Sequence, residues 1–152
     1  MASCKSLSPM LAFKKASEAI EFYVKAFGAT ESYRLTGPDG GIGYAEVRVG
    51  DAHFSVADEN PRFNCSPITV GNTTAIMAIE VDDPDAWVAR ATSAGATVIF
   101  PVKDQFYGHR AGRIRDPFGY VWLITKEIEK LSPDQMKSRF EAMMKGHAHG
   151  GH

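Results

Sequence analysis

Two charged residues, Glu46 and Arg113, stand out as side chains whose types could do chemistry together. An arginine guanidinium can hold a carboxylate, phosphate or enolate oxygen through two parallel hydrogen bonds. A glutamate can act as a general base where burial raises its pKa, or where it meets a substrate C–H or O–H. The two side chains could instead pair with each other across an interface between modules. The sequence leaves both interpretations open.

Glu46 and Arg113 occupy corresponding positions in a sequence repeat. Residues 26–30 (AFGAT) return as residues 93–97 (SAGAT), 67 residues later, and Arg113 follows Glu46 by the same 67 residues. This offset also aligns the apolar positions of one predicted helix with those of a second. Because a single offset aligns a helix and the glycine that ends it, we expect two copies of one structural unit, with a site built between them.

Each copy has the hydrophobic periodicity of a βαβββ unit, so the predicted fold class is α+β. The first copy comprises a strand at 8–14, a helix between Ser17 and Gly28, and strands at 30–35, 43–49 and 53–57. The second comprises a strand at 74–81, a helix between Asp83 and Gly95, strands at 97–100, 113–115 and 120–126, and a loop at 103–110. A capping box at Ser132 begins an added helix, whose apolar stripe should pack against the body or a second copy: Met136, Phe140, Met143 and Met144.

The predicted organisation is a single domain over residues 1–145. It contains module one at about 8–57, module two at about 74–126 and the C-terminal helix at about 132–145. Residues 146–152 form a tail rich in glycine and histidine. We expect this tail to be flexible and to bind metal only incidentally.

Composition and charge exclude several classes of function. The chain has 152 residues, of which 44% are hydrophobic and 23% charged, as in a globular protein with a real core. A net charge of −1 indicates neither nucleic acid nor an anionic membrane as a partner. No apolar run approaches the roughly 20 residues of a membrane span. Cys4 and Cys65 lack metal or redox spacing and the first residues lack a secretory signal, so we expect a cytoplasmic protein.

Several motifs resemble the vicinal oxygen chelate superfamily, which includes glyoxalase I, bleomycin-resistance proteins, fosfomycin-resistance enzymes and extradiol dioxygenases. The likeness rests on the repeated unit and on three motifs: 22–23 (FY), 27–29 (FGA) and 116–119 (DPFG). Three further stretches are similar to its PhnB-like branch: 57–59 (ADE), 104–108 (DQFYG) and 132–133 (SP). The resemblance implies a glyoxalase/bleomycin-resistance-type fold with an added C-terminal helix.

The resemblance also implies where a metal would lie. In the superfamily's enzymes each module curls into a half-cup, and His, Gln or Glu ligands from the first and last strands of both modules hold a divalent metal. The corresponding residues here are Ser8, Val56, Ile76 and Leu123. Serine is a poor ligand and aliphatic side chains cannot coordinate, so we predict no metal at the usual site and no cofactor. A metal would need a non-standard site, with four candidates nearby: Tyr44, Glu46, Glu80 and His109.

If those positions face the cup, strand alternation predicts the rest of its lining. The predicted ligand-binding residues are Tyr44, Glu46, Arg48, Phe54, Glu80, Gln105, Tyr107 and Arg113, with Glu46 and Arg113 as the catalytic candidates. Tyr44 could equally be ordinary packing, and Gln105 and Tyr107 could be exposed loop residues. The same alternation puts His53, Tyr120 and Trp122 on the opposite, helix-facing side.

Two functions follow as expectations. The first is a homodimeric, small-molecule-binding protein of the resistance or sequestration type, similar to the bleomycin-resistance proteins and without the usual metal. The alternative is an isomerase, lyase or dioxygenase of the same superfamily that acts on a small oxygenated substrate. Both use a small molecule as partner, and neither involves nucleic acid or a membrane.

Overall fold

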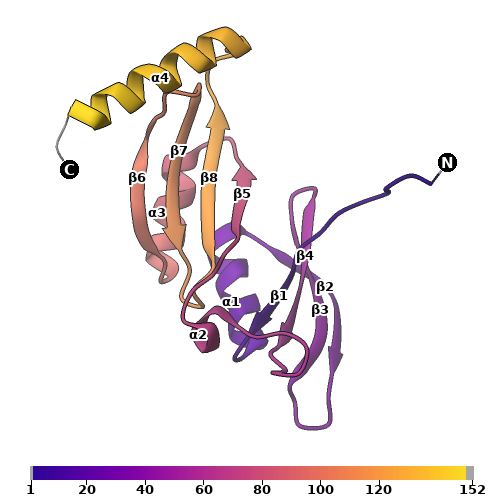
Figure 1. Ribbon diagram of the computed structural model, residues 1–152. Helices are drawn as coiled ribbons and strands as arrows, with labels where there is room; N and C mark the ends of the chain where they lie inside the picture. The colour runs from indigo at the N-terminus through magenta and orange to yellow at the C-terminus, as the bar shows by residue number, and fades with distance from the viewer. Residues whose placement is uncertain (1, 150–152) are drawn as a thin grey trace.

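The computed structural model describes residues 2–149 and contains the two predicted βαβββ modules, which confirms the α+β class (Figure 1). Module one consists of β1 (Met10–Phe13), α1 (Ala16–Phe27), β2 (Thr30–Thr36), β3 (Ile42–Val49) and β4 (Ala52–Asp58). Module two consists of β5 (Ile76–Glu80), α3 (Pro84–Ala94), β6 (Thr97–Asp104), β7 (His109–Arg115) and β8 (Val121–Glu127). The short helix α2 (Pro67–Val70), which the sequence analysis missed, connects the modules, and α4 (Pro133–His149) follows them.

Each module forms a four-stranded sheet with the same strand order. The strand orders are β1-β4-β3-β2 and β5-β8-β7-β6. In the first sheet β1 runs parallel to its neighbour β4, and in the second β5 runs parallel to its neighbour β8. Helix α1 packs against β1, β3 and β4, helix α3 packs against β6, β7 and β8, and the two helices contact each other. The two helices therefore join the modules, and each sheet keeps one face free of helices, called here its open face (Figure 1).

The helix-facing sides of the two sheets form one core. In β3 the alternation predicted from the sequence is observed, with Ala45, Val47 and Val49 buried and the residues between them more exposed. In module two, Ile114 and Trp122 are buried in the same way. The aromatic rings of helix α1 contact Trp122, so the core is continuous across the module boundary.

Several local sequence signals act as expected. Gly28 and Gly95 end their helices with φ angles of 65° and 123°, which side chains with a Cβ rarely adopt. The Asp83 side chain accepts a hydrogen bond from the Ala86 amide and caps α3. Ser17, which was expected to cap the first helix as well as to mark its start, lies inside α1, because the helix begins at Ala16. The Ala16 amide instead donates to the Asp58 carboxylate at 2.8 Å, so a strand of the same module caps the helix.

Two predicted boundaries change in the C-terminal part of the chain. The predicted loop at 103–110 is shorter and covers only residues 105–108, because β6 continues to Asp104 and β7 begins at His109. Helix α4 extends to His149, beyond the predicted end at 145, and the last three residues of the predicted tail lie outside the described residues. Among residues 2–149, no helix is both long enough and apolar enough to cross a membrane.

A buried carboxylate joins the two modules. Asp116 of module two accepts hydrogen bonds from Tyr23 Oη of α1 at 2.5 Å and from Trp122 Nε1 at 2.9 Å. It also accepts the amides of Phe118 and Tyr120, each at 3.0 Å. Burial raises the pKa of Asp116, and the four donors oppose that rise. The Asp116–Gly119 turn is therefore a structural connection between modules.

Candidate ligand-binding site

The open face of module two carries a row of side chains across all four strands. Strand pairing sets Phe100 of β6 beside Arg113 of β7, Arg113 beside Leu123 of β8, and Leu123 beside Ala78 of β5. Residues paired in this way point to the same face of a sheet. The prediction that Arg113 and Leu123 share the open face is therefore confirmed.

Around this row lies a hollow of about 310 Å³. It is open to solvent on one side, and α4 lies across the end of the sheet that carries it (Figure 1). The side chains that surround Arg113 there are Phe100, Lys103, Gln105, Tyr107, Leu123 and Met143. Its volume falls at the lower end of the range of ligand pockets, and its mixture of apolar walls with a few polar groups is typical of them.

Arg113 has an unusual environment for a charged side chain. Its Nε is buried and has no hydrogen-bond partner within residues 2–149. Its Cζ lies 5.4 Å from the centroid of the Phe100 ring, at the distance of a cation–π contact. A buried donor without an acceptor costs free energy. The Arg113 guanidinium also forms no ion pair within residues 2–149, so its charge is available for an anion or a carbonyl oxygen.

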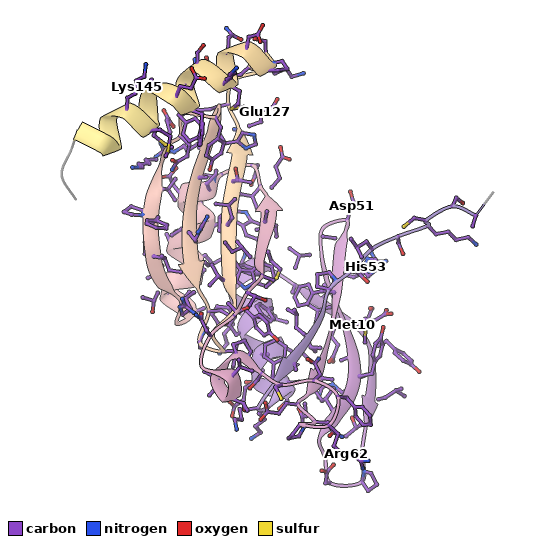
Figure 2. The ribbon with its side chains drawn as sticks, viewed as in Figure 1. Met10, Asp51, His53, Arg62, Glu127 and Lys145 are labelled. Carbon is purple, nitrogen blue, oxygen red and sulfur yellow. The ribbon has the colours of Figure 1, made fainter. Side chains whose placement is uncertain are left out.

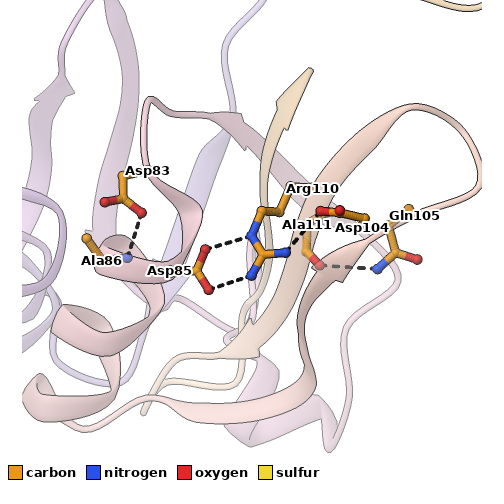
Figure 3. Close-up of polar contacts among 7 residues, drawn as sticks. All are labelled: Asp83, Asp85, Ala86, Asp104, Gln105, Arg110 and Ala111. Carbon is orange, nitrogen blue, oxygen red and sulfur yellow. Dashed lines mark hydrogen bonds and ion pairs between the residues drawn. The ribbon is translucent and has the colours of Figure 1, made fainter. Parts of the chain in front are cut away.

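The other predicted residues of the β6–β7 hairpin are partly engaged. The Gln105 side-chain amide donates to the Ala111 carbonyl at 3.2 Å, and Arg110 is held by Asp85 and Asp104 (Figure 3). Tyr107 lines the hollow, as predicted.

His109 lies beside this hairpin on β7. It contacts the Tyr107 ring and shares a hydrogen bond of 2.9 Å with the Thr125 hydroxyl. The hairpin therefore supplies Gln105 and Tyr107 to the hollow, while Arg110 serves the structure.

The predicted polar residues of module one lie on a different open face. Tyr44 Oη donates to Glu46 at 3.0 Å, and this hydrogen bond raises the pKa of Tyr44. Arg48 is exposed on the same face. Glu46 and Arg113 belong to separate sheets, and no hydrogen bond or ion pair joins them in the described part of the chain. Within one chain, therefore, Glu46 and Arg113 do not pair with each other, and Glu46 does not line the hollow that contains Arg113.

Two predicted positions on β4 are wrong. Phe54 and Val56 pair with Val47 and Ala45, so they face the helix side of the sheet and not its open face, with exposed fractions of 5% and 1%. Phe54 nevertheless lines a cavity between β1 and β5. His53, expected on the helix side, pairs with Arg48 and is exposed.

These errors on β4 arise because the turn between β3 and β4 differs in length from the turn between β7 and β8. Arg48 pairs with His53 in module one, whereas the corresponding Arg115 pairs with Val121 in module two. The second turn is therefore one residue longer, and the offset between the copies rises from 67 to 68 residues. On this register Ser55, and not Val56, corresponds to Leu123.

The metal candidates are dispersed. Among the described residues, no group of three His, Cys, Asp or Glu side chains is close enough to hold a metal ion. Glu80 lies on β5 and lines a separate cleft beside the β3–β4 turn instead of the hollow. With the corrected register, the usual ligand positions hold Ser8, Ser55, Ile76 and Leu123. The absence of a resident metal stays a prediction.

A second and larger cavity, of about 550 Å³, lies between the edge strands β1 and β5. Met10, Ile76 and Trp122 are among its mainly apolar lining residues, and His53 is its one ionisable side chain. Figure 2 labels Met10 and His53 on the module-one side. The cavity lies between the two copies, where the sequence analysis expected a site, and Phe54, one of the predicted ligand-binding residues, lines it. With few polar groups it has little means to orient a ligand.

A comparison with family models identifies the superfamily of this chain. A family model described as the Glyoxalase/Bleomycin resistance protein/Dioxygenase superfamily matches residues 7–124. The uncharacterized protein Mb0911c of Mycobacterium bovis is 34% identical over 145 residues, which cover 93% of this chain and 95% of that protein.

Solved structures share the fold. The crystal structure of a glyoxalase/bleomycin resistance protein/dioxygenase from Nocardioides matches 88% of this chain and 90% of its own, with a TM-score of 0.65 and 21% identity. A structure described as a putative 3-demethylubiquinone-9 3-methyltransferase, PhnB protein, from Bacillus cereus matches 80% of this chain and 99% of its own, with a TM-score of 0.59 and 17% identity.

Proposed function

Because the chain belongs to the glyoxalase/bleomycin resistance protein/dioxygenase superfamily, we propose that it is a small-molecule-binding protein of the resistance or sequestration type, in the PhnB-like branch. The observation that carries the proposal is the hollow on the open face of module two, where apolar and polar side chains surround Arg113, whose buried Nε has no acceptor within residues 2–149. A fold of this kind hosts unrelated functions, so the proposal depends on this site and not on the fold.

Binding is favoured over turnover by the distribution of the candidate catalytic groups. Glu46 is bonded to Tyr44 on the module-one sheet, away from the hollow that contains Arg113. A general base must come within hydrogen-bond reach of the proton that it removes. A ligand in the module-two hollow therefore meets Arg113 without meeting Glu46 of the same chain.

The test is a thermal-shift screen of small aromatic and oxygenated compounds, followed by titration calorimetry of the hits. Binding should raise the melting temperature by mass action. Phe100→Ala removes an exposed wall of the hollow and should weaken the hits about tenfold. Val98→Ala is the matched control, because Val98 is exposed on the same strand but does not line the hollow. No hits, or equal affinities for both variants, would contradict the proposal.

We also propose that the protein acts as a homodimer whose open faces are covered by a second copy. Large apolar side chains remain exposed on these faces, among them Tyr33 and Leu35 in module one and Ile76 in module two, with exposed fractions of about half. Such patches mark interaction surfaces. Light scattering should give twice the 16.6-kDa chain mass, and Leu35→Glu should lower that mass. A single-chain mass for the unmodified protein at micromolar concentration would overturn the dimer.

A cytoplasmic location remains part of the proposal. It rests on Cys4 and Cys65, which are both free thiols in the structure.

A further inference from the structure

We propose that the module-two hollow is selective for anionic ligands with a flat, apolar body, and that Arg113 binds their acid group. This inference rests on the proposed function, since it names the chemical class of the ligand that the same hollow would bind. It follows from three features of the hollow: the signs of its charges, the unpaired state of Arg113 and the geometry of the Phe100 contact.

The charges that line the hollow have one sign. Among the described residues that line it, the basic side chains are Lys103 and Arg113, and none is a carboxylate. The nearest acidic residue along β6, Asp104, is held by Arg110 at 2.9 Å. A concave surface with cations alone raises the local concentration of anions.

Arg113 also lacks the partner that a half-buried arginine normally has. Its Nε is buried without an acceptor, and Arg113 takes part in no ion pair within residues 2–149. Other arginines of the chain, Arg110 and Arg139, each bind a carboxylate through two nitrogen atoms. A ligand acid group would supply to Arg113 the acceptor that the chain itself supplies to these two.

The aromatic contact orients the guanidinium. Phe100 lies 5.4 Å from the Arg113 Cζ, measured to its ring centroid, and a guanidinium binds acceptors that lie in its own plane. A carboxylate or a phosphate fits that fork with two parallel hydrogen bonds. Tyr107, Leu123 and Met143 then provide the apolar surface for the body of the ligand, and a hollow of about 310 Å³ suits one or two rings.

The experiment compares four probes of one shape by titration calorimetry on the unmodified chain. They are naphthoate, naphthyl phosphate, neutral naphthamide and cationic naphthylmethylammonium. We expect at least one anion to bind about tenfold tighter than naphthamide, and the cation to bind most weakly. The ratio of the dissociation constants of naphthoate and naphthyl phosphate tells whether the hollow binds a carboxylate or a phosphate more tightly.

Substitutions then assign the selectivity to Arg113. Arg113→Met keeps an unbranched apolar stem but removes the guanidinium, and it should reduce the preference for anions to less than about twofold. Arg115→Gln is the matched control, because Arg115 lies on the same strand and face but does not line the hollow. This variant should keep the preference within about twofold, because the Arg115 guanidinium donates to the Gly119 carbonyl at 3.2 Å instead of lining the hollow.

The outcomes separate this inference from the proposed function. If naphthamide binds as tightly as both anions, the anion selectivity is wrong while the small-molecule-binding function stands. If Arg113→Met folds and keeps the anion preference, the assignment to Arg113 is wrong. If neither the probes nor any compound of the broader screen binds, both the anion selectivity and the proposed small-molecule-binding function are wrong. The probe comparison needs only the unmodified chain, so it tests the anion selectivity even if the Arg113→Met variant does not fold.

Discussion

Replacing Asp116 by alanine should lower the free energy of unfolding by about 3–5 kcal/mol. The carboxylate is 3% exposed and accepts four hydrogen bonds, from Tyr23, Trp122 and two backbone amides. Without it, the Tyr23 hydroxyl and the Trp122 indole N–H are buried without an acceptor. Because Tyr23 belongs to module one and Trp122 to module two, the loss weakens the connection between modules as well as the turn.

Urea unfolding followed by tryptophan fluorescence measures this loss, since Trp122 itself contacts the carboxylate. Asp51→Ala is the matched control, because Asp51 lies exposed in the corresponding turn of module one and should change stability by no more than about 0.5 kcal/mol. Tyr23→Phe removes one of the four donors and should cost about 1–2 kcal/mol. A loss below about 1 kcal/mol for Asp116→Ala would show that this network is not a major source of stability.

Much of the fold was predictable because the signals that specify it are local. The two helices end at glycines that must adopt positive φ angles, and the period-two alternation of residues 43–49 already separates a buried face from an open one. The repeat then extends the interpretation of one module to the other. These signals depend on neighbouring residues, and no distant contact needed to be known.

The error on β4 shows where that reasoning stops. A turn that is one residue longer reverses which side chains face the core, because side chains alternate at every residue along a strand. The repeat aligns Glu46 with Arg113 correctly, but it fails for Phe54 and Val56 beyond the turn. The buried apolar character of both residues was a signal that could have corrected the register.

The candidate site was only partly predictable. Arg113 and Tyr107 were identified from residue type and position, but Phe100, Lys103 and Met143 were not. Lys103 had been assigned to a loop, and the contribution of Met143 depends on how α4 lies across the sheet. The unpartnered state of Arg113 is a property of three-dimensional packing, so no sequence pattern indicates it.

The second large effect is expected for Tyr120→Phe, which should lower the free energy of unfolding by about 2–4 kcal/mol. The Tyr120 hydroxyl, from module two, donates to the Ala12 carbonyl at 2.8 Å and accepts from the Ala12 amide at 2.9 Å. Ala12 lies on β1, an edge strand whose other side is paired with β4. The hydroxyl therefore makes with Ala12 the two hydrogen bonds that a neighbouring strand would otherwise make at that edge.

Phenylalanine keeps the ring contact with Phe13 but leaves two buried backbone groups of Ala12 unpaired. Urea unfolding gives the loss of stability, and hydrogen exchange should show the Ala12 amide exchanging much faster than in the unmodified chain. Tyr33→Phe is the control, because Tyr33 is about half exposed and should change stability by no more than about 0.5 kcal/mol. If Tyr120→Phe behaved like this control and Ala12 stayed protected, water or a shifted strand would satisfy the edge. The Tyr120 hydroxyl would then add little to the core packing, the Asp116 network and the Arg90 hydrogen bonds to α1 that also join the modules.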